Sequence, residues 1–266
     1  SPLELKTKIN VEYFAEFAQK HLDFSIFLDF LKPISPKNCQ PKTNKFKPFS
    51  NIKPIAIAED KIFHFQYPET KEYLNEIGIP LISWNIYDDQ EIPKEANSLI
   101  IPGGFPERFA QQISNSKRSL NSLREFYKEK FIYAECGGMM ILGDSIEDEN
   151  GLSHNMAGIL PFKSKKGRLS VGYRYIKGAK DSIVIKKDQE IKGHEFHYWE
   201  IITQNKDKHF NSSFSPPWKI KSWGTRYKKE GWSNENLHAS WVHLHLPSNK
   251  KALRNMLINH QKRNPN

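Results

Sequence analysis

The sequence predicts an α/β protein with a mostly parallel sheet, helices on both faces of that sheet, and antiparallel hairpins in the C-terminal half. Between residues 54 and 150, short apolar runs alternate with helical patterns, which is typical of parallel strands joined by crossover helices. The runs are apolar at consecutive positions, as expected for strands buried on both faces. Beyond about residue 150, segments such as 170–175 favour hairpins instead.

The first half is expected to contain the parallel strands and their helices. Strands are expected at 55–58, 80–84, 98–101 and 131–134. Helices are expected at 68–77, from about 107, and at 120–130. The helix at 68–77 begins at Pro68 and stops at Gly78, residues that favour those positions. Two of the strands run into glycine pairs, and ligands of such sheets bind at the carboxyl ends of strands.

The C-terminal half is expected to hold hairpin strands at 170–175 and 183–185 and a last strand at 239–243. The polar stretch 205–217 is expected to be a loop, and 249–261 a closing helix.

The N-terminal residues predict a different organisation. Residues 32–53 are rich in Pro, Lys and Asn, and because Pro disfavours both helix and sheet, they are expected to form a linker. Apolar residues at helical spacing between Val11 and Leu22 predict that segment 9–31 forms one helix and then a turn. Such a helix buries little by itself, so residues 1–31 are expected to be the tail of a missing upstream domain. The domain proper is expected at 54–266.

Charge is the unusual bulk property. The 266 residues include 40 Lys and Arg against 30 Asp and Glu, a formal net charge of +10. A basic balance is compatible with nucleic acid, a membrane surface or an acidic ligand. The Lys residues are scattered, without the interleaved aromatics of a single-strand binder. A solvated lysine-rich surface is therefore favoured, with neither nucleic acid nor membrane as a partner.

Composition also bounds the class of protein. Aromatic residues make up 12% of the chain, which argues against disorder. No stretch approaches the ~18 apolar residues of a membrane helix. The two cysteines, Cys39 and Cys136, cannot form a disulfide framework and fit a reducing compartment, so a cytoplasmic location is expected.

Cys136 is the sharpest chemical feature. It follows the apolar run 131–134 and is flanked by Glu135 and by Gly137 and Gly138. This context is typical of a nucleophile elbow, a tight strand-to-helix turn that pushes the side chain out of the sheet. The alternative, a buried structural cysteine at a strand end, is less favoured in this context.

A cysteine nucleophile needs a general base that is distant in sequence. His243 ends the last apolar strand and is the favoured candidate. His194 and His197 flank Glu195 in a polar–aromatic patch, but their spacing is not that of a His-Glu-x-x-His zinc motif. No metal is therefore expected there, and a substrate-contacting or supporting role is favoured.

The glycine pair Gly103 and Gly104 follows the third strand. Opposite a nucleophilic cysteine, such a turn is a candidate oxyanion hole, because glycine lets backbone N–H groups turn toward developing negative charge. No Gly-x-x-x-x-Gly-Lys-[Ser/Thr] phosphate loop occurs in the chain, so ATP is not expected to bind through one.

Six motifs in order carry a family resemblance: 55–69 (IAIAED…FHFQYPE), 102–107 (PGGFPE), 134–140 (AECGGMM), 156–161 (MAGILP), 193–198 (GHEFHY) and 239–245 (ASWVHLH). Together they resemble the glutamine amidotransferase domain of the cobyrinic acid a,c-diamide synthases over about residues 53–250. The resemblance implies a class I glutamine amidotransferase-like, flavodoxin-like fold.

The resemblance also implies a reaction. Cys136 would attack the side-chain amide of glutamine and form a thioester, with His243 activating the thiol. Backbone amides near Gly104 and Gly137 would hold the oxyanion. The ammonia would amidate the a and c carboxylates of cobyrinic acid in a missing N-terminal synthetase domain, which would bind ATP and Mg²⁺; no cofactor is expected in this chain.

One departure and two alternatives accompany this reading. Many related glutaminases have a Glu two residues after the catalytic His, where this chain has His245. The acid that orients the histidine is therefore absent or comes from elsewhere.

Another cobalamin-type amidotransferase, such as a cobyric acid synthase, is a close alternative, although the 193–198 motif favours the a,c-diamide branch. The alternative from another class is a non-catalytic basic binding module. Glu135, His194, Glu195 and His197 are expected to contact the substrate or support the catalytic pair.

Overall fold

A computed structural model of the protein describes residues 11–30, 52–203 and 213–262. They divide into two compact units, Ser1–Phe46 and Lys47–Asn266. The expected linker at 32–53 falls almost entirely outside the described residues, as does most of the expected loop at 205–217.

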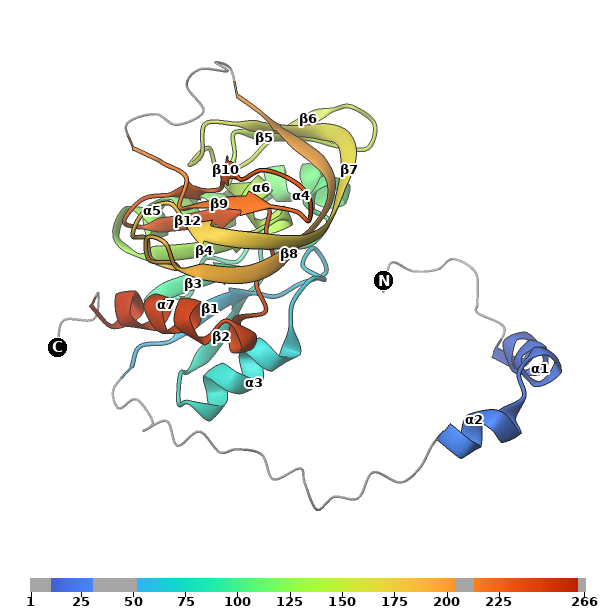
Figure 1. The fold of residues 1–266 in the computed structure, drawn as a ribbon. Helices are drawn as coiled ribbons and strands as arrows, with labels where there is room; N and C mark the ends of the chain where they lie inside the picture. The colour runs from blue at the N-terminus through green and yellow to red at the C-terminus, as the bar shows by residue number, and fades with distance from the viewer. Residues whose placement is uncertain (1–10, 31–51, 204–212, 263–266) are drawn as a thin grey trace. The chain divides into compact units, whose positions relative to one another are not determined.

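The larger unit is built on a six-stranded sheet in the order β11-β12-β4-β3-β1-β2 (Figure 1). Its strands are β1 (Ile55–Ala58), β2 (Leu81–Trp84), β3 (Ser98–Ile101), β4 (Phe131–Glu135), β11 (Trp232–Ser233) and β12 (Leu237–Ser240). All neighbouring pairs are parallel except β11 with β12. The predicted mostly parallel α/β sheet is confirmed.

Helices cover both faces of this sheet, and the alternation of strand side chains decides which residues face which helices. Ala56 and Ala58 share a core with residues of α4 (Ala110–Asn115), α5 (Lys117–Glu129) and α6 (Gly137–Leu142). Ile55 and Ile57 share the opposite core with residues of α3 (Pro68–Glu76) and α7 (Lys250–Lys262). The helix predicted from about residue 107 begins as a 3₁₀ turn, Pro106–Phe109.

A second sheet follows in the C-terminal half, in the order β10-β9-β7-β5-β6 with β8 also paired to β7. Its strands are β5 (Ser145–Glu147), β6 (Ser153–Asn155), β7 (Lys163–Gly178), β8 (Glu190–Ile202), β9 (Trp218–Lys221) and β10 (Lys228–Glu230). The antiparallel β7–β8 pair is long and curved (Figure 1). The predicted C-terminal hairpins are therefore present.

The strand expected at 183–185 is wrong. This segment lies between β7 and β8 and is buried but irregular. Ser182 closes it by hydrogen bonding to both the N–H and the C=O of Ile185, and Asn255 of α7 donates to the carbonyl of Val184 at 3.0 Å. Side chains thus satisfy backbone groups that a strand would pair with a neighbour.

The segment 9–31, expected to form one helix and then a turn, contains a second helix in place of the turn. The described residues form α1 (Val11–His21) and α2 (Phe24–Phe30). Asp23 lies between them and accepts hydrogen bonds from the N–H and hydroxyl of Ser25. Its carboxylate therefore caps a new helix start, which apolar spacing alone does not reveal.

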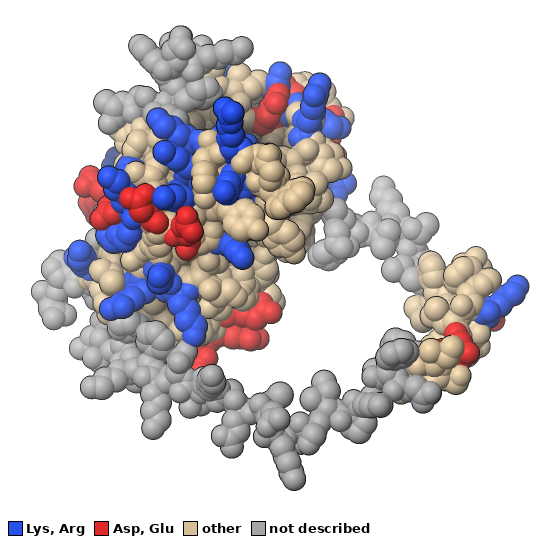
Figure 2. Space-filling view, in the orientation of Figure 1, with Lys and Arg blue, Asp and Glu red and all other residues tan. Residues whose placement is uncertain are grey.

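Surface charge follows the scattered pattern of the sequence. Figure 2 shows Lys and Arg side chains spread over the visible face of the larger unit, with Asp and Glu among them. Within 11–30, 52–203 and 213–262, no helix is long and apolar enough to cross a membrane.

His238 of β12 is a buried imidazole without a hydrogen-bond partner on either ring nitrogen among the described residues. It stacks on Tyr133 at 5.5 Å and meets the Trp218 ring edge-on at 4.4 Å. Burial, followed by the charge of Lys180, lowers the pKa of His238 to about 3.

We expect the buried, neutral His238 to lower the free energy of unfolding as the pH decreases. The unfolded imidazole takes up a proton below about pH 6.5, whereas the folded one stays neutral down to about pH 3. Relative to His238→Leu, the wild-type free energy of unfolding should drop by about 1.4 kcal/mol between about pH 7.5 and pH 5.5. Urea unfolding at both pH values measures this difference; parallel losses in the two proteins would contradict it.

Candidate active site

Cys136 sits at the bend between β4 and α6. Its φ of 47° and ψ of −110° lie in a region that non-glycine residues rarely adopt. The N–H of Cys136 donates to the carbonyl of Ser240 at 2.7 Å, and the carbonyl of Cys136 accepts the N–H of Met140, in the first turn of α6, at 3.1 Å. These bonds hold the strained conformation in place, as in a nucleophile elbow.

His243 lies just beyond β12 rather than within it. It forms an isolated antiparallel bridge with His194 of β8, through backbone hydrogen bonds of 2.8 and 3.1 Å. The imidazole is 1% exposed and hydrogen bonds to Cys136. Gly103 makes room for it, because a Cβ there would lie 2.3 Å from the ring's Cε1 atom.

Glu135 supplies an acid that faces His243. Its Oε2 atom lies 3.5 Å from Nδ1 of His243, and the carboxylate is almost fully buried. Its other oxygen accepts hydrogen bonds from the Tyr133 hydroxyl and, at 2.8 Å, from the N–H of Leu244. The structure thus places the Glu135 carboxylate at Nδ1 of His243, in a chain that has His245 where related glutaminases have the orienting Glu.

The electrostatics of this group follow from its burial. Burial alone lowers the pKa of His243, but its hydrogen bonds and charge interactions with Cys136 and Glu135 raise it to about 10. Burial and the adjacent Glu135 raise the pKa of Tyr133 well above its usual value. Tyr133 therefore remains a hydroxyl donor to the carboxylate at physiological pH.

Gly104 and Gly137 lie side by side next to the cysteine. A Cβ on Gly137 would approach the backbone N and O of Gly104 within 2.9 Å, and one on Gly104 would overlap the carbonyl of Ile62. The N–H of Gly104 donates to no group in the described parts of the chain. The N–H of Gly137 is in the first turn of α6, where helix donors lack an intrahelical partner.

His194 packs directly against the catalytic-site candidate His243. Their rings stack at 4.9 Å between centroids with an interplanar angle of 17°. The Tyr67 hydroxyl lies 3.2 Å from Nδ1 of His194. Burial and the neighbouring His243 lower the pKa of His194, which favours a neutral ring beside a charged one.

Glu195 and His197 take supporting positions. Glu195 is buried and pairs with Arg174 of β7 at 2.8 Å, so it ties β8 to β7. His197 stacks on Trp241 at 3.9 Å, and its Nδ1 lies 2.7 Å from the carbonyl of Trp199. His197 lines the cavity at Cys136, whereas Glu195 belongs to the strand pairing.

A small cavity of about 40 Å³ lies at the cysteine. It is lined by Phe65, Gly104, Phe105, Glu107, Cys136, Met140, Phe196, His197, Tyr198 and Trp199. A larger apolar groove of about 610 Å³ adjoins it and shares Phe65 and Phe196. The nucleophile candidate is thus reached from a surface formed by β7, β8 and the segment after β1.

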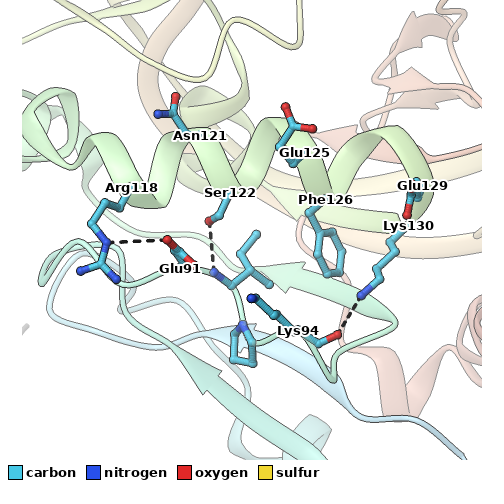
Figure 3. A pocket seen from close by; sticks show the side chains of 11 residues that line it. Glu91, Lys94, Arg118, Asn121, Ser122, Glu125, Phe126, Glu129 and Lys130 are labelled. Atoms are coloured by element: carbon cyan, nitrogen blue, oxygen red, sulfur yellow. Dashed lines mark hydrogen bonds and ion pairs between the residues drawn. The ribbon is translucent and has the colours of Figure 1, made fainter.

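A separate groove of about 490 Å³ lies between α5 and the segment before β3 (Figure 3). Several of its polar groups are already engaged. Arg118 lies 3.7 Å from Glu91, Ser122 accepts the N–H of Ile92, and Lys130 donates to the carbonyl of Lys94 (Figure 3). It contains none of the predicted site residues. Across the described segments, no group of three or more His, Cys, Asp or Glu is arranged to hold a metal ion.

The sequence analysis did not identify Tyr133, Arg174 or Glu107 as residues of the site. Tyr133 and Glu135 are two residues apart in a strand and therefore share a face, which is a signal that the sequence contains. The Arg174–Glu195 pair depends on the register of β7 with β8, which no local pattern reveals.

Comparison with known proteins identifies the family of this chain. A family described as CobB/CobQ-like glutamine amidotransferase domain matches residues 40–251. A cobyrinate a,c-diamide synthase from Caldanaerobacter subterraneus is 34% identical over 208 residues, covering 76% of this chain and 44% of that protein. One from Listeria monocytogenes is 31% identical over 256 residues, covering 95% of this chain and 54% of that protein. The chain thus spans about half the length of these relatives.

Solved structures give the same fold. PurLQS from Thermotoga maritima matches with a TM-score of 0.56 at 14% identity, over 78% of this chain and 99% of that one. A glutamine amidotransferase from Thermotoga maritima matches with a TM-score of 0.52 at 11% identity, over 79% of this chain and 84% of that one. With the family match spanning most of its length, this chain belongs to the CobB/CobQ-like glutamine amidotransferase domain family.

Proposed function

We propose that this chain is the glutaminase part of a cobyrinate a,c-diamide synthase. The observation that carries the proposal is the buried contact between Cys136, held at a positive φ, and His243, held in turn by Glu135. A nucleophile, a base and an acid that orients the base are the parts needed for acyl transfer through a covalent intermediate.

In the proposed reaction, His243 already carries the proton of the Cys136 thiol, and the Cys136 sulfur attacks the side-chain amide carbon of glutamine. The amide oxygen becomes an oxyanion, which the N–H groups of Gly104 and Gly137 stabilise. The C–N bond then breaks, and His243 returns its proton to the leaving ammonia. Water hydrolyses the thioester by the reverse sequence, releasing glutamate and the thiol. Glu135 favours the imidazolium formed at each step.

The acceptor of the ammonia follows from the relatives. They are named cobyrinate a,c-diamide synthase, and about half of their length lies outside this chain. We propose that the remaining part activates the a and c carboxylates of cobyrinate with ATP and Mg²⁺, and that residues 1–31 belong to that part. The whole protein would then be a cytoplasmic ligase of cobalamin biosynthesis. The near-complete alignment of the Listeria relative to this chain supports the assignment of residues 1–31.

In this proposal ATP and Mg²⁺ bind in the part of the protein outside this chain. The turn at Gly104 is packed against the carbonyl of Ile62 and leaves no cradle for a phosphate, and no acidic cluster for a metal occurs among the residues described. A cobyric acid synthase remains the alternative within the family, whose description names a CobB and a CobQ type together. The non-catalytic module is disfavoured, since a surface-binding role does not require a strained, buried cysteine paired with histidine.

Replacing Cys136 should remove the first covalent step. Cys136→Ser should lose labelling by a thiol-reactive glutamine analogue such as 6-diazo-5-oxo-norleucine and lower glutamate release by at least about 10³-fold, because a hydroxyl is a poor substitute for the thiolate. Cys39→Ser is the matched control and should keep both. Mass spectrometry of the labelled peptide and a glutamate assay measure these outcomes. Full activity in Cys136→Ser would refute the assignment of the nucleophile.

Replacing Glu135 should change the pH dependence of catalysis. In the wild type, His243 stays protonated up to about pH 10, so kcat should hold through the neutral range. In Glu135→Gln the charge that opposes burial is lost and the pKa of His243 falls, so kcat should decline as pH rises through neutrality. At about pH 8 we expect a loss of about 10²-fold or more, with little change in the KM for glutamine.

Tyr133→Phe is the comparison for Glu135→Gln. It removes one donor to the carboxylate but leaves the charge beside His243, so its kcat should fall by about tenfold or less with the wild-type pH profile. An unchanged pH profile in Glu135→Gln would show that the carboxylate does not govern His243.

A further inference from the structure

Glu107 is a buried carboxylate at the cavity of Cys136. It lies in the 3₁₀ turn Pro106–Phe109, which follows Gly104 and Phe105 directly. The residue is only 7% exposed. It lines the same cavity of about 40 Å³ as Cys136 and Gly104. An acidic side chain is thus held beside the nucleophile and one of the oxyanion donors, although the mechanism above does not use it.

No ion pair joins this carboxylate to a cation of the described residues, although the charge of Arg108 acts on it. Its hydrogen-bond donor in the described parts of the chain is its own backbone N–H. The Nε atom of the adjacent Arg108 lies 3.7 Å from the Glu149 carboxylate, so the charge of Arg108 acts on that acid as well. Burial, reinforced by the charge of Glu149, raises the pKa of Glu107 to about 7. A buried, unpaired carboxylate is costly to keep, and a cationic ligand would remove that cost.

The proposed reaction limits where a ligand cation can lie. The amide carbon of glutamine must meet the Cys136 sulfur, and the amide oxygen must face Gly104 and Gly137. The short side chain then keeps the amino-acid end of the substrate within the same cavity and its adjoining groove. The only cationic group on glutamine is its α-ammonium, and a carboxylate is the side chain best suited to accept it in a charge-assisted hydrogen bond.

We propose that Glu107 binds the α-ammonium of glutamine and makes the site specific for an α-amino acid amide; this rests on the glutaminase function proposed above. The cavity is close to the size of one water molecule, so glutamine enters as the lining side chains move. Phe196 and Tyr198, which line the cavity, are 39% and 47% exposed, and Phe196 also borders the open groove, so these side chains have room to turn outward.

The test compares glutamine with glutaramate, which has the same amide but no α-ammonium, in the full-length protein. The wild type should prefer glutamine strongly in kcat/KM. Glu107→Gln should raise the KM for glutamine by about tenfold or more, because a charge-assisted hydrogen bond is lost. It should leave the KM for glutaramate nearly unchanged, so the preference collapses. Glu107→Asp, which keeps the charge, should retain part of the preference.

Two measurements separate binding from a structural role. Alkylation of Cys136 by iodoacetamide, which carries no ammonium, should proceed at the wild-type rate in Glu107→Gln. The matched control Glu149→Gln, which removes the neighbouring exposed acid, should keep the preference for glutamine. If Glu107→Gln weakens both substrates equally or slows alkylation, the assignment of the ammonium site is wrong. If the wild type neither hydrolyses glutamine nor is labelled at Cys136, the glutaminase function itself fails.

Discussion

The carboxylate of Glu135 is the buried charge on which the rest of the site depends. It contacts His243, Tyr133 and the backbone of Leu244 while remaining almost fully buried. Removing one partner of a buried charge pair typically costs about 3–5 kcal/mol. The alignment of β4 with β12, which places Ser240 opposite Glu135, therefore fixes the acid, the base and the nucleophile together. One strand pairing thus positions all of the groups that exchange protons.

Strand geometry explains how one segment serves two purposes. Tyr133 and Glu135 point to one face of β4, whereas Ala134 packs in the core on the other face. The positive φ of Cys136 then breaks the alternation and aims the thiol at the cavity at the strand end. The following glycine, Gly137, allows the backbone of Gly104 to come close. The strain at Cys136 is tolerated because these contacts on both sides hold the bend.

The second sheet completes the site from outside the parallel sheet. β8 brings His194 onto His243 and Phe196 onto the nucleophile, whose sulfur lies 3.7 Å from the Phe196 carbonyl. The buried Arg174–Glu195 pair joins β8 to β7 at this level. A hairpin distant from the nucleophile in sequence therefore forms the wall of the cavity, and its position decides how much space a substrate finds there.

The sequence by itself determined the parallel sheet, the hairpins and the pairing candidates Cys136 and His243, because apolar periodicity and glycine turns are local signals. It did not determine that 183–185 is irregular or that Asp23 interrupts the first helix, since side-chain hydrogen bonds decide both. Only the tertiary structure decided that Glu135 faces His243 and that Glu107 is buried at the cavity with no ion pair to any described residue. Those facts depend on strand register and burial, which bring together residues that are far apart in the chain.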